Sequence, residues 1–349
     1  MPSKIDVEYL ALVVIIILVF WKFWRLVTRR GKKMSDAAIV GDPTIHRTFL
    51  DSHVSFLIEF GELQKLADKI FSLTLEKYNQ PPEKEPEGEA LDQYTALRLA
   101  QIIIFCLTRS AYDGFNDVFI LAGNCRGFAA KMMLRMMYEH LVTASFIAMK
   151  PEEGKIFDDH ASIEKWKVWI RTLKAVPEAK DTVQHEQIQK LDEQQKRVRT
   201  RLKAEKCKTC KQPITQDAWT RVNVDTMAEQ VDAATGSKSL ANLYAPCYLM
   251  PTALMHPTAF GLEARLDTTE AGLVYKDLPE AQAHDSLLRA HGLVLRLFKL
   301  MNEYFALGLD VELDSRWKAF PKIWDGALVD PPAEADQEAP VLGQGGGLT

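Results

Sequence analysis

A run of apolar residues near the N-terminus constrains this chain more than any other feature. The run "YLALVVIIILVFWKFWRLV" covers residues 9–27, and its part from Leu10 to Trp21 carries no charge. A helix needs about 20 mostly apolar residues to cross the hydrocarbon core of a bilayer. We therefore expect residues 9–27 to form a single transmembrane helix, preceded by a short segment at 1–8, with the lipid bilayer as its partner.

The charges around this run predict its orientation. Lys4 is the only basic residue before it, and Asp6 and Glu8 offset that charge. A basic cluster follows within or just after the run: Arg25, Arg29, Arg30, Lys32 and Lys33. By the positive-inside rule, the N-terminus lies outside the cell inner membrane and the main domain lies in the cytoplasm. A cleaved signal peptide is the alternative, but it would need a basic start and a small-residue cleavage site.

The remaining chain has the composition of a helical domain. The protein has 349 residues, 47% of them hydrophobic, and its net charge of -4 gives no whole-chain reason to expect nucleic acid. Five cysteines do not suggest a disulfide framework. Apolar positions recur at helical spacing, and no useful alternating pattern occurs. We expect an all-α fold with a basic juxtamembrane linker at 28–41, a helical bundle at 42–308 and a largely disordered tail at 309–349.

Helix boundaries can be predicted from caps, prolines and apolar spacing. Asp42-Pro43 starts the first helix, and Asp113-Gly114 indicates a turn. Residues 178–213 are very polar and predict a protruding hairpin arm. The helices expected in the bundle are 43–78, 91–112, 116–149, one from Pro151, 178–206, 222–233, 239–256 and 279–308.

Arg135 and Glu139 are placed in the most apolar segment outside the N-terminal run, "MMLRMMYEHLVTASFIAM". Residues four apart share one face of a helix. A helix that is apolar all round is normally buried, and a buried arginine is costly unless it is paired. Two interpretations stay open: a structural ion pair that fixes the helix register, or a polar site in the bundle interior. We expect His256, at the end of a tyrosine-rich helix, to meet this pair.

Three segments together resemble a known family. They are "RMMYEH", then "DAWTRVNVDTMAEQV", then "LYAPCYLMPTALMHPTAFG". In this order they are similar to an uncharacterised family of bacterial all-helical proteins, domain of unknown function fifty-six seventy-seven, over roughly residues 95–305. The resemblance singles out Arg135, Glu139 and His256 and implies no activity. The family usually has a serine before the histidine, whereas this chain has Met250-Pro251-Thr252.

An alternative interpretation makes the same helix catalytic. "RMMYEH" also fits Arg-x4-His, which resembles the motif of the HEPN-like metal-independent ribonucleases. His140 would then act as acid or base and Arg135 would hold the phosphate. Residues five apart diverge by about 140° around a regular helix, which weakens this interpretation.

Two further features bear on cofactors and partners. Cys207-x2-Cys210 is half of a zinc knuckle without its second pair, so we expect no metal there and no cofactor elsewhere. The arm is locally basic over 196–211, which would suit anionic lipid or nucleic acid if its charges are more than a solvated face. The sequence thus favours a membrane-anchored binding or regulatory module, with its small-molecule or protein partner unknown.

Overall fold

The structure is a computed structural model that describes residues 43–82, 86–176, 185–204, 219–220, 222–269, 272–275 and 280–324. The predicted transmembrane helix at 9–27, the linker at 28–41 and the Cys207–Cys210 pair lie outside these residues. The described part is almost wholly helical, so the all-α prediction is confirmed.

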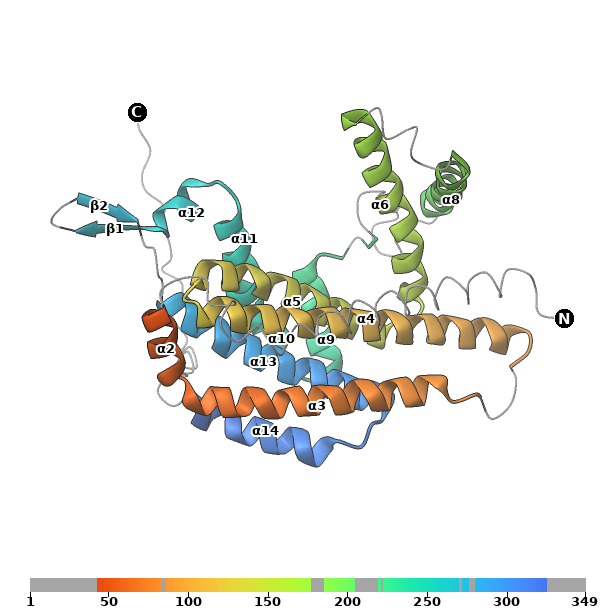
Figure 1. The fold of residues 1–349 in the computed structure, drawn as a ribbon. Helices are drawn as coiled ribbons and strands as arrows, with labels where there is room; N and C mark the ends of the chain where they lie inside the picture. The colour runs from red at the N-terminus through yellow and green to blue at the C-terminus, as the bar shows by residue number, and fades with distance from the viewer. Residues whose placement is uncertain are drawn as a thin grey trace, which may run out of the picture.

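The helices follow one another through the bundle, with one short hairpin late in the chain (Figure 1). Their bounds are α2 (Pro43–Asp51), α3 (Val54–Asn79), α4 (Glu89–Gly123), α5 (Gly127–Met149), α6 (Glu153–Ala175), α8 (His185–Ala204), α9 (Val224–Thr235), α10 (Ser239–Tyr244), the π-helical turn η1 (Ala245–Leu249), α11 (Met250–Met255), α12 (Ala259–Glu263), β1 (Leu266–Thr269), β2 (Gly272–Tyr275), α13 (Glu280–Phe305) and α14 (Asp310–Ile323).

The core lies where α4, α5 and α13 pack against one another. α3 and α14 cover α13, while α9, α10 and η1 cover α5. Ile104, Phe115, Tyr138 and Phe298 are fully buried at the centre. Each such side chain stabilises the fold by roughly 1.5–3 kcal/mol relative to exposure.

The turn predicted at Asp113-Gly114 is wrong, because α4 runs through it to Gly123. Gly114 instead allows α4 and α5 to approach closely. A Cβ at this position would lie 2.5 Å from Met136 Cε and 3.2 Å from Met137 Cγ. The chain turns later, where Cys125 has a φ of 54° and the Arg126 amide donates to the Leu121 carbonyl.

The first predicted helix is also divided, between α2 and α3. The Ser52 hydroxyl donates to the Phe49 carbonyl at 2.7 Å, and His53 Nδ1 lies 2.7 Å from the same oxygen. Side chains that bind a nearby carbonyl in this way compete with the helix's own hydrogen bonds. This competition explains why the helix stops at Asp51.

The tail predicted from residue 309 is wrong in its first part, because residues 310–323 form α14. Leu313 and Phe320 are buried at helical spacing, and Trp324 is buried just after the helix. Asn302 ties the turn into α14 by donating to Asp310 and accepting from the Leu309 amide. Pro321 in the last turn hid this pattern in the sequence. Residues 325–349 lie outside the described residues.

The short antiparallel hairpin of β1 and β2 was not expected from the sequence. Each strand has only four residues, which is too short for an alternating pattern to stand out. The described part of the polar arm is α8, which packs on α6 to one side of the bundle (Figure 1).

By length and composition, α4 is apolar enough to cross a bilayer, and the described ranges contain no other such helix. In this fold α4 packs along α5 and α13 and contributes Ala111, Phe115 and Val118 to the interior. One face of α4 therefore lies in the core of the bundle.

Candidate functional site

Arg135 and Glu139 form an ion pair on α5, with 3.4 Å between Nη2 and Oε1. Their side chains are 25% and 36% exposed, so both are partly buried rather than enclosed in the bundle interior. α5 turns Leu134, Met137 and Tyr138 fully inward, and the pair lies on the strip beside that face. An i,i+4 pair in contact with solvent contributes only about 0.2–0.5 kcal/mol.

The aromatic partner of this pair is Tyr248 rather than His256. The Arg135 guanidinium carbon lies 4.9 Å from the centre of the Tyr248 ring. Tyr248 stacks on Tyr244 with 5.2 Å between ring centres. Burial, and then the charge of Glu139, raise the pKa of Tyr248. The two tyrosines at i and i+4 in "LYAPCY" were the sequence signal for this contact.

His256 lies in the bend between α11 and α12 and is exposed. Among the described residues, its side chain makes no hydrogen bond or ion pair. The predicted group of Arg135, Glu139 and His256 is therefore not joined by such contacts. A functional role for these three residues stays a prediction.

His140 is half-buried, and its Nδ1 lies 2.6 Å from the Met136 carbonyl oxygen of its own helix. Arg135 is directed toward Glu139 and Tyr248 instead. No contact in the described part of the chain joins Arg135 to His140. The ribonuclease interpretation gains no support from this geometry.

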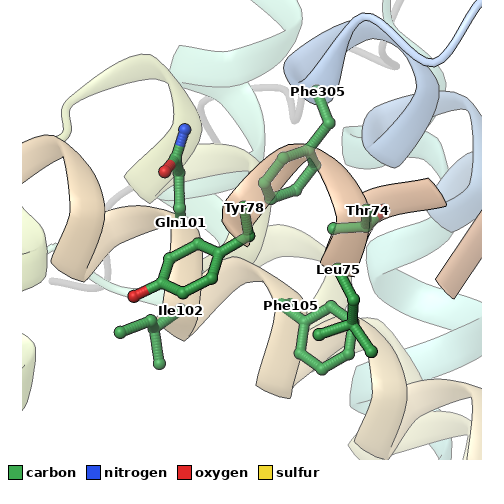
Figure 2. Close-up of a pocket in the computed structure, with 7 residues that line it drawn as sticks. All are labelled: Thr74, Leu75, Tyr78, Gln101, Ile102, Phe105 and Phe305. Atoms are coloured by element: carbon green, nitrogen blue, oxygen red, sulfur yellow. The ribbon is translucent and has the colours of Figure 1, made fainter. Parts of the chain in front are cut away.

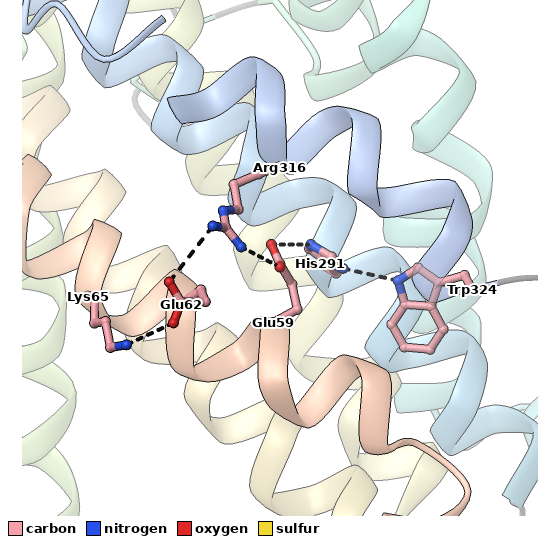
Figure 3. Close-up of polar contacts among 6 residues, drawn as sticks. All are labelled: Glu59, Glu62, Lys65, His291, Arg316 and Trp324. Carbon is pink, nitrogen blue, oxygen red and sulfur yellow. Dashed lines mark hydrogen bonds and ion pairs between the residues drawn. The ribbon is translucent and has the colours of Figure 1, made fainter. Parts of the chain in front are cut away.

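A buried polar cluster does exist, but it lies on α3, α13 and α14 (Figure 3). Arg316 Nη1 donates to Glu59 Oε2 at 2.8 Å, and Glu59 is only 4% exposed. Glu59 Oε1 faces His291 Nε2 at 3.9 Å. On the other side of the imidazole, Trp324 Nε1 donates to His291 Nδ1 at 3.0 Å. Since Nδ1 accepts this bond, the proton of the neutral His291 ring is on Nε2, pointing at Glu59.

Sequence reasoning missed this cluster, although a signal was present. Glu59 lies in the apolar stripe of α3, three residues after Phe56 and four residues before Leu63. His291 lies on the same buried face of α13 as Leu287 and Val294.

A pair of histidines extends the cluster toward α2. His53 Nε2 and His284 Nδ1 are 2.8 Å apart, and the His284 ring packs edge-on against Trp324. Burial, and then the neighbouring His53, lower the pKa of His284. These contacts join the chain just after α2 to the start of α13.

The acid stability of the protein should depend on His291. Burial lowers the pKa of His291 to about 3. Glu59 opposes this effect only weakly, because Arg316 neutralises its charge. The unfolded chain binds a proton at this histidine below about pH 6.5, whereas the folded chain stays neutral until about pH 3. Stability is therefore lost as the pH falls from about 6.5 toward 3.

At pH 5.5, one unit below the unfolded value, we expect His291 alone to remove about 1.4 kcal/mol of unfolding free energy relative to pH 7.5. Burial raises the pKa of Glu59, so its protonation recovers part of the loss at lower pH. Chemical denaturation at the two pH values, compared with His291→Gln, measures the contribution. An equal loss in the variant would contradict the assignment.

A groove with charged walls lies between α5, α9 and α13 and has a volume of about 700 Å³. Leu141, Ala148, Met149 and Leu300 give it an apolar floor. Polar groups also line it: Ser145, Asp232, Ser237, Ser239, Arg296, Lys299, Glu303 and Tyr304.

Arg296 is the unusual residue of this groove. Its Nη1 donates to the Gly292 carbonyl at 2.8 Å, and its guanidinium lies 5.0 Å from the Trp317 ring centre. Burial lowers the pKa of Arg296, and the nearby Cys247, and then Asp232, offset this in part. Among the described residues it has no ion-pair partner, whereas Lys299 pairs with Glu303 at 3.6 Å. The Tyr304 hydroxyl is buried and has no hydrogen-bond partner in the described part.

A smaller apolar pocket of about 90 Å³ lies between α3, α4 and the end of α13 (Figure 2). Tyr78, Ile102, Phe105 and Phe305 form most of its wall. Its Thr74 hydroxyl already donates to the Ile70 carbonyl. The pocket thus has little polar chemistry to offer a ligand.

The described part of the basic arm is partly neutralised within the protein. Lys196 Nζ lies 2.6 Å from Asp192 of α8, and Arg201 pairs with Asp159 of α6. Binding of anionic lipid or nucleic acid at 196–211 stays a prediction. Over the ranges that the structure describes, no group of three or more His, Cys, Asp or Glu could hold a metal ion.

Part of the chain matches the model of a known protein family. Residues 101–273 match the model described as "Family of unknown function (DUF5677)". These residues belong to DUF5677. The match lies inside the span predicted from the sequence and includes Arg135, Glu139 and His256, as well as the α5 and α9 walls of the groove. No curated protein and no solved structure matches the chain. The DUF5677 match adds no activity to the chemistry of the site.

Proposed function

We propose that this DUF5677 protein is a membrane-anchored binding module, and that its ligand occupies the groove between α5, α9 and α13. The proposal rests on the partly buried guanidinium of Arg296, which has no carboxylate partner among the described residues. A largely buried guanidinium without a carboxylate partner is costly, and an anionic ligand would remove that cost. The groove volume of about 700 Å³ suits a small molecule.

The groove chemistry indicates the kind of ligand. Arg296 and the free Tyr304 hydroxyl can both donate hydrogen bonds to a carboxylate or phosphate. Leu141, Met149 and Leu300 can cover an apolar body attached to it. We therefore expect a small amphipathic anion.

The membrane part of the proposal is supported by the sequence. Residues 9–27 would span the inner membrane, and the basic cluster from Arg25 to Lys33 would keep the bundle in the cytoplasm. Activity of a C-terminal reporter that works only outside the inner membrane would contradict this orientation.

Ligand binding is tested with phenyl phosphate and phenylacetate, added to the full chain in lipid nanodiscs. We expect both probes to raise the thermal midpoint, and Arg296→Met to weaken their binding by about tenfold or more, because a charge-assisted hydrogen bond contributes about 1.5–3 kcal/mol. Calorimetric titration gives the dissociation constants.

Two controls accompany this test. Lys299→Met removes a charge at the exposed rim and should leave binding nearly unchanged, since Lys299 is already paired with Glu303. Phenethyl alcohol, which has the ring without the charge, should not stabilise the protein. Equal affinity of the wild type and Arg296→Met for both anions would exclude the groove as their site.

A further inference from the structure

One end of the bundle exposes a set of large apolar side chains. They are Leu249, Met250, Met255, Phe260, Leu262 and Leu273, each between 40% and 72% exposed. They belong to η1, α11, α12 and β2, and each of these elements packs on the next or on β1. We call this set the apolar end.

The sequence of the apolar end has no charges to keep it in water. From Ser239 to Leu262 the chain contains no Asp, Glu, Lys or Arg. Soluble surfaces seldom gather large apolar side chains in this way unless a partner or a membrane covers them. His256 lies within this stretch, next to Met255, and is exposed together with it.

The chain comes from the predicted membrane anchor at this same end. α2 begins at Pro43. His53, which lies between α2 and α3, contacts His284 near the start of α13. The next residue, Asp285, pairs with Lys131 at the start of α5. Arg265, between α12 and β1, lies 4.8 Å from the ring centre of Phe128 in that first turn of α5. Figure 1 shows α2, α11, α12 and the hairpin together at one end of the bundle.

The length of the tether favours this end over the other. Residues 28–42 separate the apolar run from α2. A chain of this length spans roughly 20 Å as a coil and at most about 50 Å when fully extended. α3 has 26 residues, so it is about 39 Å long and carries the opposite end of the bundle that much farther from α2. Unless the tether is almost fully extended, it keeps the apolar end closer to the bilayer than the opposite end.

We propose that the apolar end docks on the cytoplasmic surface of the bilayer, with Met255, Phe260 and Leu262 entering the interface between head groups and acyl chains. This inference rests on the proposed membrane anchor. Arg126 is exposed between α4 and α5, two residues before the Phe128 that Arg265 contacts, and its long side chain can reach lipid phosphates. The docked end fixes the orientation of the bundle on the membrane.

The test uses the full chain in vesicles of phosphatidylcholine and phosphatidylglycerol. The vesicles contain a phospholipid with a carbene-forming photolabel near the glycerol end of its acyl chain. Mass spectrometry then maps the labelled residues. We expect label in both 9–27 and 249–262. In the double variant Met255→Glu/Phe260→Glu, the amount of label in 249–262 should fall at least about fivefold, while the amount of label in 9–27 stays the same.

Val311→Glu is the matched control, because Val311 is a large apolar side chain exposed on α14, outside the apolar end. It should change neither labelled region. Both substituted positions in the double variant are exposed, so its thermal midpoint should equal that of the wild type. Label in 9–27 without label in 249–262 would overturn the docking and leave the anchor intact. Absence of label in 9–27 would overturn the anchor itself.

A second copy of the chain is the competing occupant. A photoreactive residue at position 260 distinguishes it from lipid. Adducts with lipid support the docking, and cross-links between two protomers at this position overturn it.

Discussion

Replacing Glu59 with alanine should lower the free energy of unfolding by about 2–4 kcal/mol. The substitution leaves Arg316 without its 2.8 Å partner in a largely buried position, and breaking a buried pair typically costs about 3–5 kcal/mol. Arg316 is 28% exposed, so water recovers part of that cost. Thermal unfolding measures the loss, expected to be roughly 4–16 °C in the midpoint.

Glu62→Ala is the matched control for this prediction. Glu62 lies one turn after Glu59 and faces the same guanidinium at 3.8 Å, but it is 39% exposed and also pairs with Lys65. Its removal should cost less than about 1 kcal/mol. The double variant Glu59→Leu/Arg316→Met should recover much of the loss, since it leaves no unpaired charge. Similar losses in Glu59→Ala and Glu62→Ala would show that burial does not set the cost.

Replacing Asp232 with alanine should destabilise the protein by about 2–4 kcal/mol. Asp232 is 4% exposed, and its carboxylate accepts hydrogen bonds from the Leu240 amide at 3.0 Å and the Ala241 amide at 2.8 Å. Amides in the first turn of a helix have no partner within the helix, so the substitution leaves them unsatisfied. Each unsatisfied buried group costs about 1–3 kcal/mol. Thermal unfolding of the full chain measures the change.

Asp225→Ala serves as the comparison for Asp232→Ala. Asp225 is also an acid near a helix start, but it accepts from the Thr226 amide at an exposed position, and its removal should cost about 0.5–1 kcal/mol. Asp232→Asn keeps one acceptor oxygen and should lie between the two. If Asp232→Ala proved as mild as Asp225→Ala, the carboxylate would not be what holds α10 on α9.

The interior polar group shows how far sequence reasoning could go. An arginine and a glutamate in the apolar α5 segment indicated a mostly buried pair, and Arg135 and Glu139 lie partly buried at the edge of the inward face of α5. A helix that is apolar all round gives no direction for its buried face, since every orientation hides apolar residues. The helices that pack on α5 decide which strip of it faces inward. Here α4, α9 and α13 cover the strip that carries Leu134 and Tyr138.

The same reasoning explains the residues that were missed. Glu59 and His291 each belong to the buried face of an amphipathic helix, so their positions were visible in the spacing. Their partners Arg316 and Trp324 come from α14 and the residue after it, which lie in the span 309–349 that composition predicted to be a largely disordered tail. A polar residue at a core position cannot be interpreted until its partner is known, because pairing decides whether its burial is tolerated.

The sequence by itself determined the helical class, most helix positions and the match to DUF5677, because these depend on local spacing and on short segments. Only the tertiary structure decided that Gly114 lies in a close contact between α4 and α5 rather than in a turn. It also decided that Glu59 is buried more deeply than Glu139, and that Arg296 lines a groove. Each of these depends on which surfaces of separate helices meet. Helical periodicity places a residue on a face, but the packing of distant segments decides what that face contacts.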